Sequence, residues 1–356
     1  MPEFTLVEQP ASIAADLGKH DYVGVDTEFM REKTFFAELC LVQVATGKTI
    51  YCVDPLNDHS MDEFWPALMR DTWVVHSGRQ DIEVVYQTSG EIPGRLFDTQ
   101  IAAGLLGHAP QMGYATLIKE LFDVEIEKTH TRANWSKRPL PDAFLEYAAE
   151  DVEYLLPAYE ALAEQLDGKG RLAWAEEDSA LLLNPALYDV DPKLAVERMK
   201  GARNLRGKRR AVATRLAAWR ETEALRANRP RQWIAKDSAL LEVAASMPES
   251  IEALGGIDGM PAGLIRRSGE SILSAVTASG GDDNYRPPAA PDEQQKALLK
   301  SVQKQVAECA ADLGLAAETV ASKRDLSAVI MGGDRASKVL SGWRRSLVGD
   351  QLLKML

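Results

Sequence analysis

Two acidic residues, separated by one residue, end a strand-like segment near the start of the chain. Asp26 and Glu28 follow the apolar run that enters from Asp21-Tyr22. Side chains two apart in an extended strand point to the same face, so both carboxylates project together. Buried carboxylates repel each other unless a cation lies between them, and hard oxygen ligands suit Mg²⁺ or Mn²⁺. The pair therefore predicts a metal site, the alternative being a solvated strand edge.

Two further acids and a tyrosine can complete such a site. Asp81 follows an apolar segment and a turn, near a helix start where the helix dipole favours a carboxylate. Tyr147 and Asp151 are four apart in a helical segment, so they share one face. Four acids can hold two cations that clamp the attacking and leaving oxygens of a phosphoryl displacement, and a tyrosine hydroxyl can orient the water or take its proton. Considered alone, Asp81 is also consistent with a helix cap. Considered alone, Tyr147 and Asp151 are also consistent with ordinary core and surface residues of a helix.

The elements that must position these residues alternate between strands and helices. We expect strands at Asp21–Phe29, Glu38–Thr46, Thr49–Val53, Trp73–His76 and Arg95–Asp98. We expect helices at Met61–Met69, Gln80–Gln87, Thr99–Leu106, Tyr114–Phe122, and from Asp142 to Leu166 with a bend near Pro157. Strands first, with helices interleaved afterwards, predict an α/β fold with a mixed sheet flanked by helices.

The strand signal ends after about Gly170, and two Pro- and Gly-rich segments divide the remainder of the chain. The predicted domains are residues 1–190, which carry all five catalytic candidates, and two all-α domains at 191–285 and 286–356. The two helical domains have similar lengths, which leaves a divergent repeat open.

Composition indicates a globular protein of the cytoplasm. The chain has 356 residues, 46% of them hydrophobic, and contains no apolar run near the roughly 20 residues that span a bilayer. The N-terminus lacks the pattern of a signal peptide, and Cys40, Cys52 and Cys309 show no metal-type spacing. We expect Cys40 and Cys52 to be core thiols, no membrane contact, and a cytoplasmic location; protein partners are not predicted.

Charge is distributed unevenly along the chain. The net charge is -12, yet the segment from Arg198 to Lys236 holds 13 Lys and Arg and only two acids. Within it, Arg206, Arg209 and Arg210 belong to the densest basic run. Such a segment can bind RNA phosphates or the acidic body of the same molecule; we expect RNA.

The acidic motifs resemble those of a known family. Asp26-Thr27-Glu28, Asp81 after His76-Ser77-Gly78, and Tyr147 four residues before Asp151 resemble the three exonuclease motifs of the DEDD superfamily, in its DEDDy branch. The segments 31–45 and 134–140 resemble the ribonuclease D family in particular. Trp219-Arg220, 228–230 and 265–269 are similar to the helicase-and-RNase-D C-terminal (HRDC) domain, and the last segment resembles a second, more divergent copy.

This resemblance covers nearly the whole chain and carries specific implications. It implies an RNase H-like exonuclease fold followed by two HRDC-like domains, and dependence on two divalent cations, Mg²⁺ or Mn²⁺. It also implies 3′→5′ exoribonuclease activity that trims precursor tRNA 3′ ends and other structured RNA, and releases nucleoside 5′-monophosphates. The metal ligands would be Asp26, Glu28, Asp81 and Asp151, with Tyr147 as a further catalytic residue.

Several other residues are candidates for contact with the single-stranded 3′ tail. Phe29 and Met30 can stack on the terminal base or simply pack, and Thr27, Gln43 and His76 lie near the acids in sequence. A basic loop with an aromatic centre can hold a strand or remain a solvated loop; it comprises Lys128, His130, Arg132, Trp135, Lys137 and Arg138.

Two other functions remain open at this stage. A DNA 3′→5′ exonuclease of proofreading type would use the same metal chemistry, because the motifs around the acids do not read the sugar. A non-catalytic RNA-binding protein would need only the helical domains. Retention of all five site residues argues against this second alternative.

Overall fold

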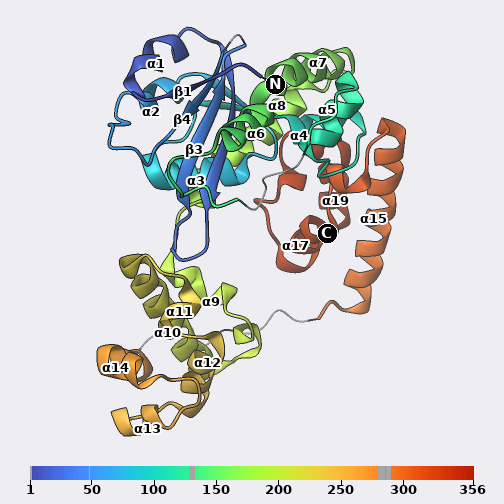
Figure 1. The fold of residues 1–356 in the computed structure, drawn as a ribbon. Helices are drawn as coiled ribbons and strands as arrows, with labels where there is room; N and C mark the ends of the chain where they lie inside the picture. The colour runs from blue at the N-terminus through green and yellow to red at the C-terminus, as the bar shows by residue number, and fades with distance from the viewer. Residues whose placement is uncertain (1, 48, 128–132, 280–284, 286–289) are drawn as a thin grey trace. The chain divides into compact units, whose positions relative to one another are not determined.

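The chain forms two compact units. A computed structural model describes residues 2–47, 49–127, 133–279, 285 and 290–356 (Figure 1). The sheet unit comprises Met1–Met30, Glu38–Tyr188 and Pro291–Leu356. The helical unit comprises Arg31–Ala37 and Asp189–Ala290.

A six-stranded mixed sheet forms the centre of the sheet unit. Its strands are β1 (Phe4–Val7), β2 (Tyr22–Met30), β3 (Glu38–Ala45), β4 (Ile50–Val53), β5 (Thr72–Val75) and β6 (Arg95–Asp98), in the order β1-β4-β3-β2-β5-β6. β3 runs antiparallel to both β2 and β4, whereas β1 pairs in parallel with β4, and β5 with β2 and β6. The predicted mixed sheet flanked by helices is confirmed; β1 was not predicted.

Helices cover both faces of this sheet. The helices of this part are α1 (Ala11–Leu17), α2 (Phe64–Leu68), α3 (Arg79–Ser89), α4 (Thr99–Leu106), α5 (Tyr114–Phe122), α6 (Asp142–Glu153), α7 (Leu155–Gly168) and α8 (Leu172–Ala180). Strand residues alternate in direction, so Thr27 of β2 faces α3 while Asp26 and Glu28 face α6. Trp73, Phe64 and Leu68 are fully buried, and Cys40 and Cys52 are buried free thiols, as expected.

The expected bend near Pro157 lies three residues earlier. The helix breaks at Tyr154, whose backbone N–H donates a hydrogen bond to the hydroxyl of Tyr114 at 3.0 Å instead of continuing α6. Pro157 falls in the first turn of α7, where a missing N–H costs little because the first N–H groups of a helix have no partner within that helix.

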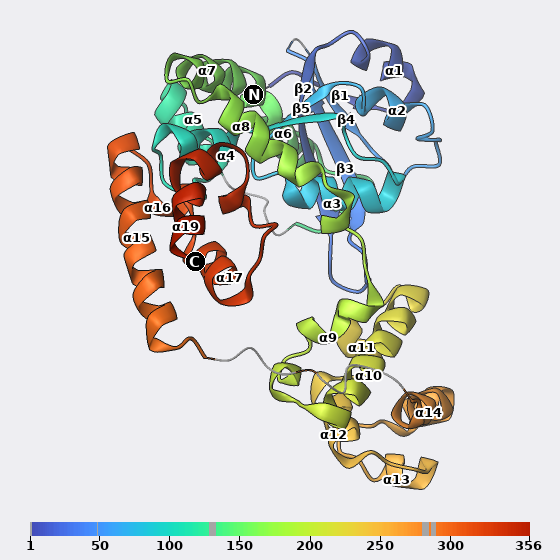
Figure 2. The ribbon, with the colours of Figure 1, turned by 180° about the vertical axis from the view of Figure 1, so that it is seen from behind.

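The C-terminal segment packs within the sheet unit. It contains α15 (Glu293–Leu313), α16 (Ala317–Val320), α17 (Lys323–Gly332), α18 (Gly342–Arg344) and α19 (Asp350–Met355). Figure 2 shows these helices beside α4, α5 and α8. Trp343 joins a buried cluster with Leu105, Leu162 and Leu166. Pro291–Leu356 and Glu38–Tyr188 thus belong to one compact unit.

The helical unit has its own apolar core. Its helices are α9 (Ala195–Arg198), α10 (Gly207–Ala227), α11 (Arg231–Ile234), α12 (Asp237–Ser246), α13 (Ile251–Gly255) and α14 (Ala262–Thr277). Leu216, Leu240 and Ile272 are fully buried in this core. The short segment Arg31–Ala37 docks here, because Asn228 Oδ1 accepts hydrogen bonds from the backbone N–H groups of residues 35 and 36.

No helix in the described part of the chain has the length and apolarity needed to cross a membrane.

Candidate active site

Strand β2 presents the first two acids. Asp26 lies opposite Gln43 of β3, and Glu28 lies opposite Leu41, with an irregularity in the register just after Glu28. Both carboxylates therefore point to the sheet face that α6 covers, as the spacing of two residues predicts.

The third acid reaches the same place from α3. Asp81 lies in the first turn of this helix and is buried. Its Oδ1 accepts hydrogen bonds from the hydroxyl of Thr27 at 2.6 Å and from the backbone N–H of Thr27 at 3.1 Å. Thr27 is itself buried, so it acts as a support for Asp81 and offers little surface to a substrate.

The turn before α3 is fixed by an acid that sequence reasoning missed. Asp98, at the end of β6, accepts hydrogen bonds from the backbone N–H groups of Ser77 and Gly78, each at 3.0 Å. Ser77 has a left-handed backbone with φ 61°, and a Cβ at Gly78 would approach Val75 to 2.4 Å. The signal for Asp98 was its position before a helix, since it also caps α4 through the N–H of Gln100 at 2.9 Å.

Helix α6 supplies the tyrosine and the fourth acid. Tyr147 and Asp151 are one turn apart on this helix, and their side chains are hydrogen-bonded to each other. The tyrosine is 9% exposed. The structure thus brings all five predicted catalytic residues together from β2, α3 and α6.

Burial and mutual repulsion between the carboxylates of this cluster raise their pKa values. Burial, followed by the charges of Asp81, Asp151 and Glu28, raises the pKa of Asp26 well above its usual value. Burial, followed by Asp151 and Asp81, raises the pKa of Glu28 to about 8. Burial raises the pKa of Asp81 to about 6, although its hydrogen bonds with Thr27 lower it.

These residues suit a divalent cation. All the charged groups are carboxylates, the ligand type that Mg²⁺ and Mn²⁺ prefer, and a cation would offset the repulsion that raises their pKa values. Across the described residues, no three His, Cys, Asp or Glu side chains already stand in a metal-holding group. The acids therefore converge without forming a finished coordination sphere.

The other predicted contacts near the acids divide into two groups. Gln43 is fully buried, and neither polar atom of its side chain has a hydrogen-bond partner among the described residues. His76 has both ring nitrogens engaged, with Thr99 Oγ1 and the carbonyl of Met112, each at 2.9 Å. Phe29 and Met30, at the end of β2, are only partly buried. These two therefore keep surface for a substrate.

The basic loop differs from its prediction. Trp135 is only 2% exposed and packs against Phe144 and Tyr147, so it is a core residue without a face for stacking on RNA. Arg138 directs its guanidinium to Asp54 at 2.6 Å and to the carbonyls of Cys40 and Trp135 at 2.7 Å, so its donors serve the fold. Lys137 is exposed, and Lys128, His130 and Arg132 lie outside the described residues.

The basic segment of the helical unit also has partners of its own. Arg210 is 3% exposed, pairs with Glu197, donates to the carbonyl of Ala202 at 3.0 Å and stacks on Tyr285, so its guanidinium offers little surface to RNA. Other arginines of this segment also pair internally: Arg231 and Arg198 with Glu221, Arg220 with Asp237, and Arg226 with Glu223. Arg206 and Arg209 are exposed and have no ion pair within the described residues.

Comparisons with known proteins identify the family of this chain. Residues 3–167 match the model of the 3'-5' exonuclease family, and residues 209–276 match the HRDC domain. Ribonuclease D of Gluconacetobacter diazotrophicus is 37% identical over 99% of this chain and 91% of its own, and that of Pseudomonas paraeruginosa is 34% identical over 100% and 98%. The crystal structure of Escherichia coli RNase D, described as an exoribonuclease involved in structured RNA processing, superposes with a TM-score of 0.89 at 26% identity, covering 100% of this chain and 99% of that one. The chain belongs to the ribonuclease D family of 3′→5′ exoribonucleases.

Proposed function

We propose that this exoribonuclease uses Asp26, Glu28, Asp81 and Asp151 to hold two divalent cations, Mg²⁺ or Mn²⁺, while it trims the 3′ ends of precursor tRNA and other structured RNA. DEDD-type exonucleases depend on divalent metal ions. The observation that carries the proposal is the convergence of four carboxylates from three separate elements, beside one tyrosine hydroxyl.

Each residue of the cluster has a distinct part. Bound cations would lower the pKa of the attacking water and stabilise the charge of the pentacovalent phosphate. Tyr147 keeps its proton, because burial, followed by the charge of Asp151, raises its pKa. Its hydroxyl is therefore a neutral group that orients the water, held in place by the hydrogen bond with Asp151. Hydrolysis that proceeds from the 3′ end releases nucleoside 5′-monophosphates.

The helical parts provide affinity and substrate choice in this proposal. We retain the division into residues 1–190, 191–285 and 286–356 as a proposal about function, with chemistry in the first. Of the predicted RNA contacts in the basic run, Arg206 and Arg209 are exposed and remain available to phosphates. Phe29 and Met30 are the candidates for contact with the terminal base. The free thiols support a reducing cytoplasm as the place of action.

The proposal is tested by digesting a tRNA that carries a 3′ extension, with each metal, beside a DNA oligonucleotide of matched sequence. We expect stepwise shortening of the RNA with release of 5′-monophosphates, and slower loss of DNA. Asp26→Asn should abolish this activity, since an amide is a weaker ligand for a hard cation, whereas Asp58→Asn, at an exposed carboxylate, serves as the matched control. Wild-type cleavage by Asp26→Asn would refute the assignment, and faster digestion of DNA would favour the proofreading alternative.

A further inference from the structure

Helix α8 lies between the C-terminal segment and the sheet. Consecutive residues on a helix point about 100° apart, and two neighbours here face different partners. Asp178 contacts the C-terminal segment, whereas Ser179 contacts β6. Both side chains are buried.

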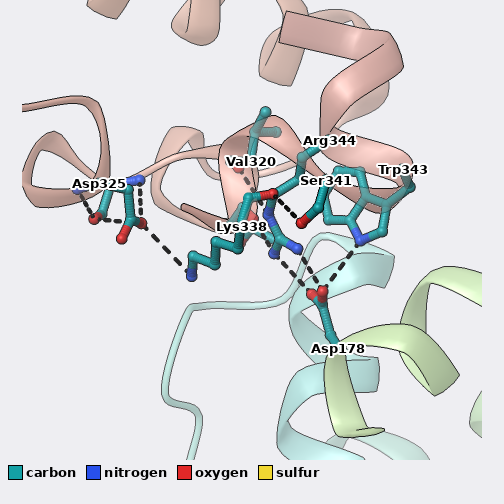
Figure 3. A network of polar contacts seen from close by, with 9 residues as sticks. Asp178, Val320, Asp325, Lys338, Ser341, Trp343 and Arg344 are labelled. Carbon is teal, nitrogen blue, oxygen red and sulfur yellow. Dashed lines mark hydrogen bonds and ion pairs between the residues drawn. The ribbon is translucent and has the colours of Figure 1, made fainter. Parts of the chain in front are cut away.

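Several hydrogen-bond donors of the C-terminal segment contact the carboxylate of Asp178. Figure 3 shows Arg344 and Trp343 converging on this carboxylate. The Arg344 guanidinium donates to both oxygens of Asp178, one of them at 2.7 Å, and the Trp343 Nε1–H donates at 3.2 Å. The remaining donors of Arg344 reach the carbonyls of Val320 at 2.9 Å and Thr319 at 3.0 Å.

Two further contacts fix the same helix. The ring of Trp343 stacks on Trp174 of α8, with centroids 4.5 Å apart and planes 5° apart. The backbone N–H of Trp343 donates to Glu177 at 3.2 Å. A Cβ on Gly342 would lie 1.4 Å from Glu177 Oε1, so only glycine permits this approach. The end of the chain therefore holds helix α8 at Trp174 and Glu177 as well as at Asp178.

The other side of α8 leads to the candidate metal site. The Ser179 hydroxyl accepts a hydrogen bond at 3.0 Å from the backbone N–H of Asp98. The carboxylate of Asp98 in turn fixes the left-handed turn at Ser77 and Gly78, from which α3 begins. Asp81 lies in the first turn of α3. Polar contacts on the two sides of α8, joined by the backbone between Asp178 and Ser179 and by Asp98 itself, thus connect Arg344 with the turn that presents Asp81.

We infer that Arg344 and Trp343 are positioning residues of the nuclease: by holding α8 they fix the Asp98-bound turn and hence the carboxylate of Asp81. The inference rests on the proposed role of Asp81 as a metal ligand. It assigns to Pro291–Leu356 a part in the chemistry, through geometry, in addition to any contact with RNA.

The test uses the full-length protein and variants at both ends of the series. Arg344→Lys keeps the charge but loses the fork of donors, and Ser179→Ala removes only the hydroxyl that contacts Asp98. Arg345→Lys is the matched control, because Arg345 pairs with Asp350 on the exposed surface. The readouts are Mn²⁺ affinity by calorimetry, the single-turnover cleavage rate of an RNA oligonucleotide, and affinity for the same RNA in Ca²⁺.

We expect Arg344→Lys and Ser179→Ala each to weaken Mn²⁺ binding and to slow cleavage about tenfold, with RNA affinity unchanged, as for other residues that orient metal ligands. The double variant should be no worse than the more affected single variant, because both act through one series of contacts. Wild-type Mn²⁺ affinity and rate in folded Arg344→Lys would overturn the inference, and so would effects that multiply in the double variant.

Two further variants separate the possible failures. If Arg344→Lys does not fold, Trp343→Phe replaces it, since phenylalanine keeps an aromatic ring on Trp174 and deletes the donor to Asp178; unchanged Mn²⁺ binding there would equally overturn the inference. Asp81→Asn tests the premise: if it binds Mn²⁺ and cleaves normally, the proposed function fails. If Asp81→Asn is inactive but the α8 variants are normal, only the present inference fails.

Discussion

Thr27 donates two hydrogen bonds to one oxygen of Asp81, from its hydroxyl at 2.6 Å and from its backbone N–H at 3.1 Å. The threonine between Asp26 and Glu28 points to the opposite face of the sheet from its two neighbours. Through it, the strand that carries two acids also orients the third.

Removing this hydroxyl should weaken metal binding in a pH-dependent way. Thr27→Val keeps the shape of the side chain, but it loses a hydrogen bond that lowers the pKa of Asp81, which stands at about 6. The pKa should rise further, so that protons compete with the metal at neutral pH. We expect Mn²⁺ affinity to fall about tenfold at pH 6.5 and to recover toward pH 8.5. Thr27→Ser is the control that retains the donor. Equal Mn²⁺ affinity of the valine and serine variants at both pH values would contradict this role.

Tyr147→Phe should separate chemistry from binding. The variant keeps the aromatic ring between Trp135 and the sheet and deletes only the hydroxyl. We expect the single-turnover rate to fall about 10²-fold, a size typical of a lost orienting group, with Mn²⁺ affinity and RNA affinity in Ca²⁺ retained. Burial raises the pKa of this tyrosine, so it should not ionise between pH 6 and 9. The pH–rate profile of the wild type should therefore show no change in slope from Tyr147 in that range. Loss of RNA binding would instead make Tyr147 a substrate contact.

Exposed and buried arginines of the basic segment should behave differently. We expect the replacement of Arg206 and Arg209 with glutamine to make the slope of log binding constant against log salt concentration shallower. The change should be about 0.7 for each phosphate that is no longer neutralised. The free energy of unfolding should not change. Arg210→Gln should leave this slope unchanged and lower the free energy of unfolding by roughly 1–3 kcal/mol, because the buried guanidinium donates to the carbonyl of Ala202, whereas its ion-pair partner Glu197 is half exposed and adds little. Titration of RNA binding against salt, with urea unfolding of each variant, makes the comparison. An unchanged slope in the double variant would show that these two exposed arginines do not contact RNA.

Asp71 should make stability depend on pH away from the candidate site. This residue is 3% exposed just before β5, and burial raises its pKa to about 6, although His20 and Arg70 lower it. The folded state therefore holds a proton that the unfolded chain releases near pH 4. The contribution of Asp71 to stability is greatest below about pH 4, decreases between pH 4 and 6, and is then constant.

Asp71→Asn should abolish this decrease. The amide is neutral at every pH, so the variant should exceed the wild type by about 1–3 kcal/mol in free energy of unfolding at pH 7.5, with a smaller difference at pH 4.5. Urea unfolding at both pH values measures it, with Asp58→Asn as the exposed control. A difference that is the same at both pH values would show that the carboxyl of Asp71 does not titrate with folding.

Spacing in the sequence was sufficient for the parts of the site that lie on single elements. Asp26 and Glu28 share a strand, and Tyr147 and Asp151 share a helix, so the period of each element places them. Asp98 could not be found in this way, because its role depends on β6 lying beside β5 in the sheet. The function of Thr27 likewise needs α3 to pack on the opposite face from the acids.

Burial explains why the expected RNA contacts were predicted less well. Trp135 and Arg138 are an aromatic and a cationic residue close together in sequence. In the structure, the ring of Trp135 is buried in the core against α6, and the guanidinium of Arg138 forms an ion pair with Asp54. The count of 13 basic residues did not reveal that Glu221 accepts two arginines within the same unit. Local composition predicts the sign of a surface only where the charges remain exposed.

The path of the chain through the two units has a consequence for how the protein is made. Arg344 follows Asp178 by 166 residues, so the ribosome must synthesise these residues, all of Asp189–Ala290 included, before the two can pair. At about 5–20 residues per second, this takes roughly 8–33 s. Throughout that interval the nascent nuclease exposes the face of Trp174 and carries the Asp178 carboxylate without the arginine that will cover it. A newly made chain therefore passes through a stage at which all its candidate catalytic residues exist but their support does not, and it is then most open to chaperones and proteases.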